Sequence, residues 1–228
     1  MKESIFRNRA FQTIFKLITA LSFALFTLYQ IVLAVAIENN RIGRLIGIAF
    51  YLMLTVASFL DLSEKDSVWI AHSVLLVAGL VLLVAMRLLS VVTVFGNLNF
   101  ANTASVLNCA IYILSQLGAL VLIAGYIMLR TDLTERKMQR VIIILMIIAV
   151  ALFTLHFALE CVLMIKYRVN VELSLKFTLI SRALYFLGFA GTALCFSLPA
   201  PKSVHKKKEG RFIYSDEEDG DGEIDLVI

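Results

Sequence analysis

The feature that most restricts this chain is a series of long apolar stretches without a charged residue. Leu17–Ile37 has 21 residues of this kind, and Ala104–Leu129 has 26. The hydrocarbon core of a bilayer is about 30 Å thick, and a helix that rises about 1.5 Å per residue crosses it with about 20 residues. Each of these stretches is therefore long enough to cross a membrane as a helix.

The composition also favours a polytopic membrane protein. Of the 228 residues, 60% are apolar and 17% are charged, whereas a soluble domain is about 45–50% apolar and about 25% charged. We predict an all-α integral membrane protein with a six-helix transmembrane bundle, because a segment in lipid must satisfy its own backbone hydrogen bonds. The predicted spans are 17–37, 42–62, 67–95, 104–129, 141–165 and 177–198.

The distribution of Lys and Arg predicts that the N- and C-termini are both cytoplasmic. In that orientation 14 of the 21 Lys and Arg residues lie inside, six lie outside, and Arg182 lies within the sixth span; cytoplasmic loops normally carry this excess. The chain then divides into a basic cytoplasmic segment, 1–16, a transmembrane domain, 17–198, and a cytoplasmic tail, 199–228. The tail is basic and then acidic, and we expect it to be disordered. The expected location is the plasma or inner cell membrane.

The N-terminal part has an alternative interpretation as a signal peptide. The basic residues of 1–16 are followed by an apolar stretch and by Ala34-Val35-Ala36, which resembles a cleavage site. Cleavage there would leave five spans and put the two ends on opposite sides of the membrane. The apolar stretch is longer than a usual signal-peptide core, which favours a retained first helix.

Four ionisable residues within the spans form the candidate intramembrane polar site. Glu160 lies five residues before the end of the fifth span, and Arg182 lies five residues after the start of the sixth. We predict that they form an ion pair in the outer leaflet, since a lone charge in hydrocarbon costs at least about 2.5 kcal/mol. His156 lies one helical turn from Glu160 on the same face, and Arg87 lies in the outer half of the third span.

This polar group has two interpretations. It either fixes helix packing, or it forms an outward-facing crevice for a solute or an ion. The other residues expected in or beside the crevice are Tyr185, Asn97, Asn99, Asn102 and Asn108.

Two pairs of small residues predict close helix contacts. Gly43-x-x-x-Gly47 opens the second span, and Gly188-x-x-Gly191 lies in the sixth. Glycine lets helix backbones approach each other, and we expect this within the bundle rather than in a dimer. His72, near the cytoplasmic start of the third span, is interpreted as a packing or interfacial histidine.

The C-terminal tail carries two motifs. Lys206, Lys207 and Lys208 are expected to bind anionic lipid headgroups. Residues 219–225 resemble the middle of an EF-hand calcium loop, but the slot of the final bidentate Glu falls on Ile228. We therefore predict a solvated acidic tail and no metal site.

Other classes of function have little support in the sequence. The cysteines, Cys109, Cys161 and Cys195, are odd in number and lie in apolar stretches, which predicts buried free thiols. No nucleotide-binding or hydrolase motif is present, so we predict no cofactor, and His156 with Glu160 is the one plausible acid–base pair of an enzyme. Basic residues interleaved with exposed aromatics, which nucleic-acid binding requires, are absent.

Two hypotheses of function remain. The first is a non-enzymatic accessory or interaction component of the membrane, with anionic lipids on the cytoplasmic face and a membrane-protein partner or a second copy of the chain. The alternative is a small-solute or ion transporter or channel that uses Arg87, His156, Glu160 and Arg182.

Overall fold

All regular secondary structure in the described part of the chain is α-helical, and no strand is present there. The structure, a computed structural model, describes residues 9–37, 41–63, 66–96, 98–130 and 136–197. The helices are α1 (Arg9–Ala36), α2 (Arg41–Leu60), α3 (Asp66–Gly96), α4 (Thr103–Arg130), α5 (Arg136–Tyr167) and α6 (Leu175–Ser197).

Five of these helices are long and apolar enough to cross a membrane. They are α1, α3, α4, α5 and α6, and the apolar part of α2, Arg44–Leu60, is shorter. Arg87 does not interrupt α3, which continues to Gly96. Residues 9–16, part of the segment expected to precede the first span, are the first turns of α1. The second span was expected to reach residue 62, but α2 ends at Leu60.

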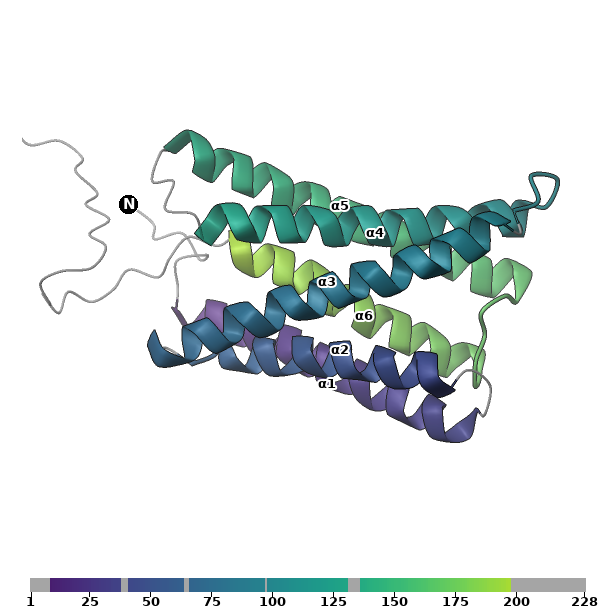
Figure 1. Ribbon diagram of the computed structural model, residues 1–228, viewed down its shortest axis with the longest axis horizontal. Coiled ribbons are helices and arrows are strands. Elements are labelled where there is room, and N and C mark those ends of the chain that lie inside the picture. The colour runs from purple at the N-terminus through teal and green to yellow at the C-terminus, as the bar shows by residue number, and fades with distance from the viewer. Residues whose placement is uncertain (1–8, 38–40, 64–65, 97, 131–135, 198–228) are drawn as a thin grey trace, which may run out of the picture.

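The helices run antiparallel and form a closed ring. Each helix packs against the next one in the chain, and α1 also packs against α6 (Figure 1). We call the end where α1 begins and α6 finishes the terminal end. The opposite end, where α1, α3 and α5 finish, is the loop end.

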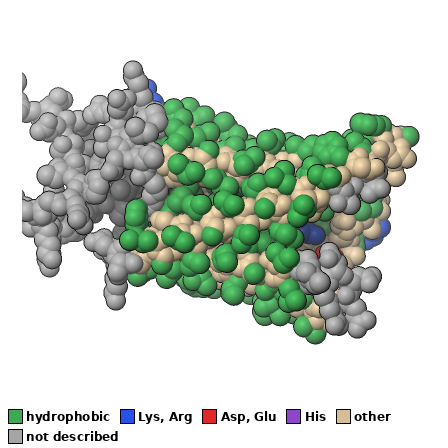
Figure 2. Space-filling view, in the orientation of Figure 1, with side chains coloured by type: hydrophobic (Ala, Val, Ile, Leu, Met, Phe, Trp, Pro, Cys, Tyr) green, Lys and Arg blue, Asp and Glu red, His purple; other side chains and the backbone are tan. Residues whose placement is uncertain are grey.

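The surface of the ring is apolar. Large hydrophobic side chains are exposed on all six helices, with Leu25 at 51% and Val92 at 73% exposure, and they cover most of the face in Figure 2. A soluble monomer rarely exposes so large an apolar surface to water. The surface is therefore suited to lipid, as the length of the helices also indicates.

Aromatic side chains from several helices fill the interior of the ring, and Tyr185 lies at their centre. Its ring centroid lies 4.6 Å from that of Phe189, 5.4 Å from that of Phe26, 6.3 Å from that of Tyr51 and 6.4 Å from that of Phe153. These residues come from α1, α2, α5 and α6. Contacts of this kind, at edge-to-face or tilted angles, are favourable beyond the area they bury.

The glycine pair in α6 makes the expected close contact within the bundle. A Cβ atom added to Gly188 would lie 2.8 Å from the Phe23 ring, and one added to Gly191 would collide with Thr19. The prediction is therefore confirmed for α1 against α6. It is wrong for Gly47 as far as the described residues go, because an added Cβ there would meet only Phe50 of its own helix, at 3.9 Å. The surroundings of Gly43 are not among the described parts of the structure.

Candidate functional site

The ion pair between Glu160 and Arg182 is present, near the loop end of α5 and α6. Arg182 Nε lies 3.6 Å from Glu160 Oε1, and the exposed fractions of the two side chains are 14% and 8%. The two residues are adjacent because α5 and α6 form a hairpin and each residue lies seven positions from the loop end of its helix. This distance is longer than a hydrogen bond, so the two groups attract each other without being tightly bonded.

His156 joins the pair from the next turn of α5. Its Nε2 lies 3.4 Å from Glu160 Oε2, while its Nδ1 lies 3.0 Å from the carbonyl oxygen of Ile111 in α4. A carbonyl can only accept, so Nδ1 carries a hydrogen and donates it. In a neutral ring Nε2 would then present a lone pair to the carboxylate. Neither Nε2 nor Oε2 has a hydrogen-bond partner among the described residues.

Arg87 of α3 lies near Glu160 as well. Its guanidinium carbon lies 5.2 Å from the centre of the Tyr112 ring in α4, a cation–π contact. Arg87 also lies close enough to Tyr51, Tyr185 and Glu160 to interact with each electrostatically. The four residues predicted from the sequence are therefore close together in space; we call Arg87, His156, Glu160 and Arg182 the charged cluster.

Tyr185 forms the floor of the charged cluster. Its hydroxyl lies 2.9 Å from Ser115 Oγ of α4, and its ring centroid lies 5.5 Å from that of His156. The hydroxyl side of Tyr185 is therefore in polar surroundings, and its ring packs among the aromatic residues toward the terminal end. The interior of the ring changes from charged to apolar at this residue.

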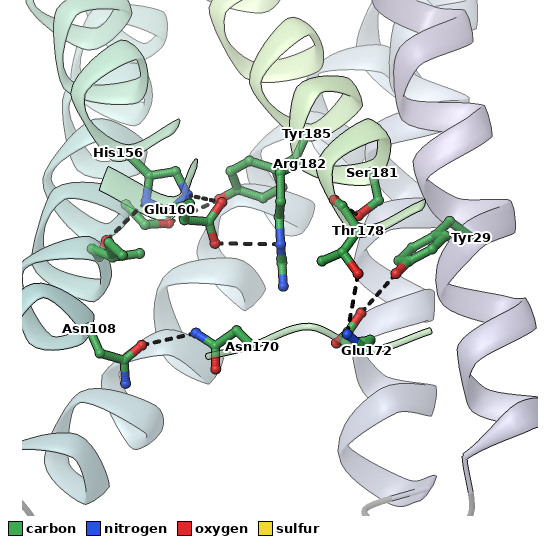
Figure 3. Close-up of polar contacts among 12 residues, drawn as sticks. Tyr29, Asn108, His156, Glu160, Asn170, Glu172, Thr178, Ser181, Arg182 and Tyr185 are labelled. Atoms are coloured by element: carbon green, nitrogen blue, oxygen red, sulfur yellow. Dashed lines mark hydrogen bonds and ion pairs between the residues drawn. The ribbon is translucent and has the colours of Figure 1, made fainter. Parts of the chain in front are cut away.

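The loop between α5 and α6 passes over the charged cluster, as Figure 3 shows. Asn170 donates to Asn108 Oδ1 of α4 at 3.1 Å, and the Tyr29 hydroxyl of α1 donates to Glu172 at 3.2 Å. The backbone N–H of Glu172 donates to Thr178 Oγ1 at 3.2 Å. These bonds connect the loop to three helices, and they hold it across the loop end of the ring.

The asparagines do not form one crevice, contrary to our expectation. Asn102 Oδ1 accepts the N–H of Ala104 at 3.0 Å, the bond of a helix N-cap at the start of α4. Asn99 Oδ1 accepts the N–H of Ala101 at 3.0 Å. Asn108 is engaged with the α5–α6 loop, and Asn97 lies outside the described residues.

Some residues of the site had no distinctive signal in the sequence. Tyr29 lies in a charge-free stretch, and 143 positions separate it from Glu172. Ser115 and Tyr112 lie in the longest charge-free stretch, and nothing in the sequence indicates which residue in another helix they meet. The position of a residue along an apolar stretch predicts its depth in a bilayer. It does not identify the residue of another helix that faces it.

A second polar group lies at the terminal end. Lys16 Nζ lies 3.0 Å from Asp61 Oδ2, and both side chains are 30% exposed. His72, which we interpreted as a packing histidine, has its Nδ1 2.8 Å from the carbonyl oxygen of Ala57. A cavity of about 20 Å³ lies among these residues, which is enough for about one water molecule.

The described residues contain no cluster of three or more His, Cys, Asp or Glu side chains that could hold a metal ion. The three cysteines are free; Cys109 is buried, and Cys161 and Cys195 are partly buried. Lys206, Lys207 and Lys208 and the EF-hand-like segment 219–225 lie outside the described residues. Comparisons of the chain with protein-family models, curated proteins and solved structures give no match.

Proposed function

We propose that this chain is a six-span membrane protein with both ends in the cytoplasm, and that it acts as a non-enzymatic component of the membrane through binding lipid and other membrane proteins. The observation that carries this proposal is the aromatic packing around Tyr185. Ring contacts to three other helices and to its own helix fill the axis of the bundle between the two polar ends, which suits a binding protein better than an open channel.

The orientation in this proposal follows from charge. The terminal end would be cytoplasmic because it is the end with the excess of Lys and Arg. Its basic residues, including Lys206, Lys207 and Lys208, would then face anionic lipids, each with about 1 kcal/mol of attraction near the surface. The charged cluster would lie on the outer side of the membrane, in the plasma or inner cell membrane.

The proposal predicts a stable partner. Purification of the full chain from native membranes in mild detergent is expected to retain another membrane protein, or a second copy of the chain, at a fixed ratio to it. The ratio is measured by size-exclusion chromatography with light scattering and by mass spectrometry of the peak. A monodisperse single chain that carries a solute across liposome membranes would contradict the proposal.

Transport is the second candidate, and one observation favours it. Three helices bring two arginines, a glutamate and a histidine together, and charges placed in a membrane often mark ion or substrate paths. On this alternative, reconstituted liposomes show a flux of small anions that Glu160→Gln abolishes and Lys176→Gln, a change at the exposed loop end, leaves intact.

A further inference from the structure

The charged cluster has more positive than negative charge. Arg87 and Arg182 carry two positive charges, and Glu160 carries one negative charge. Glu160 lies 3.6 Å from Arg182 and is the partner of that arginine, and no described acid forms an ion pair with Arg87. Glu172, in the loop above, interacts electrostatically with Arg182 and accepts a hydrogen bond from the Tyr29 hydroxyl.

Three polar atoms in the charged cluster are also buried without a hydrogen bond to any described residue. They are His156 Nε2, Glu160 Oε2 and Arg182 Nε, and the whole-residue exposures of His156 and Glu160 are 1% and 7%. Buried polar atoms in proteins are nearly always bonded, and a buried charge without a partner is strongly destabilising. Of the three atoms, Arg182 Nε is the donor that a bound anion could satisfy.

The depth of the charged cluster matches the level of lipid headgroups. α5 has 32 residues and is therefore about 48 Å long, which exceeds the roughly 30 Å hydrocarbon core. A centred helix would extend about 9 Å beyond the core at each end. Glu160 lies seven residues from the loop end of α5, or about 10 Å, and so lies close to the boundary between hydrocarbon and headgroups.

The charged cluster lies toward the loop end of the ring, and its Arg87 on α3 is partly exposed. Near the terminal end α2 and α3 touch, because a Cβ added to Gly79 of α3 would lie 2.9 Å from Leu54 of α2. Nearer the loop end, α3 diverges from α2 (Figure 1). Figure 2 shows basic and acidic atoms recessed between the two helices in this region.

We propose that Arg87 and Arg182 bind the anionic headgroup, a phosphate or a carboxylate, of an amphiphile that enters between α2 and α3 from the leaflet at the loop end. The guanidinium groups would hold the anion with paired hydrogen bonds, and the acyl chains would lie along the apolar outer faces of α2 and α3. This inference rests on the membrane-spanning arrangement proposed above, but not on its orientation or on a protein partner.

The test uses the full chain in nanodiscs of phosphatidylcholine doped with phosphatidylglycerol. Native mass spectrometry is expected to show one phosphatidylglycerol retained on the chain after the nanodisc is removed. Arg87→Gln and Arg182→Gln are each expected to weaken retention about tenfold or more, since charge-assisted bonds contribute about 1.5–3 kcal/mol. Arg87→Lys, which keeps the charge, is expected to retain part of the binding, and Lys176→Gln, which removes an exposed charge at the same end, is expected to change nothing.

Several outcomes would overturn the inference. A wild-type chain that shows no preference for phosphatidylglycerol contradicts it, whatever the variants do. Equal losses in Lys176→Gln and Arg87→Gln would mean that general surface charge attracts the lipid. Calorimetry with inorganic phosphate tests the free anion, and binding of phosphate without retention of lipid would contradict a lipid ligand. A chain that does not enter the membrane at all would refute the proposed function as well.

Discussion

Tyr185→Ala is expected to destabilise the bundle by about 3 kcal/mol or more, the range for removing a large buried side chain. The ring of Tyr185 contacts aromatic residues from α1, α2, α5 and its own helix. The substitution leaves a cavity where these helices meet, and Ser115 loses its partner. In a membrane this packing is the main source of helix association, since lipid is as apolar as the side chains.

Two further variants separate packing from hydrogen bonding at this position. Tyr185→Phe keeps the ring and removes the bond to Ser115, and we expect a loss of about 1 kcal/mol, as for interhelical hydrogen bonds in membranes. Phe177→Ala removes a 61% exposed aromatic from the same helix and is expected to have little effect. The free energy of unfolding is measured by titration with a denaturing detergent in mixed micelles. An equal loss in Tyr185→Ala and Phe177→Ala would show that Tyr185 is not central to the core.

Glu160→Gln is the second change with a large expected effect, about 3–5 kcal/mol of destabilisation. The variant keeps the shape of the side chain but removes the acid that faces Arg182 and His156, and breaking a buried pair leaves an uncompensated charge. Arg182→Gln is expected to cost a similar amount. The double variant is expected to cost less than the sum of the two, because residues in one network are coupled.

The ion pair at the terminal end provides a matched control for this double-mutant cycle, the comparison of two single variants with the double variant. Lys16 and Asp61 lie closer together than Glu160 and Arg182, but each is 30% exposed. Exposed pairs contribute about 0–1 kcal/mol, so Lys16→Gln and Asp61→Asn are each expected to have small effects. Additive losses in the Glu160 and Arg182 cycle, or larger losses in the control cycle, would contradict the importance of the buried cluster.

The sequence was sufficient to predict the apolar helices and the shared level of Glu160 and Arg182 along them. Long stretches without charge can only be buried in lipid or in a core, and the hairpin of two adjacent spans brings Glu160 and Arg182 to the same level. The same reasoning predicts that Arg87 lies in the outer half of the third span, near the level of Glu160 and Arg182. Depth along a helix is determined by counting residues from a charged flank, and this needs no knowledge of helix packing.

The lateral arrangement could not be predicted in the same way. The helices are apolar on all sides, so the sequence does not show which face of α6 carries Tyr185 toward the centre of the ring. Gly47 and Gly188 lie in similar small-residue motifs, yet only Gly188 meets another helix. Closure of the ring by α1 and α6 depends on Phe23 and Thr19 fitting against two glycines, and contacts so distant in sequence leave no periodic signal.

The central claim is that the chain crosses the membrane with its terminal end inside the cell. It is tested most directly by labelling single cysteines, in a background without Cys109, Cys161 and Cys195, with a membrane-impermeant maleimide. Asn102→Cys, at the loop end, is expected to react on intact cells, and Gln139→Cys, at the terminal end, only after permeabilisation. Reaction of both positions on intact cells, or the reverse pattern, would contradict the account.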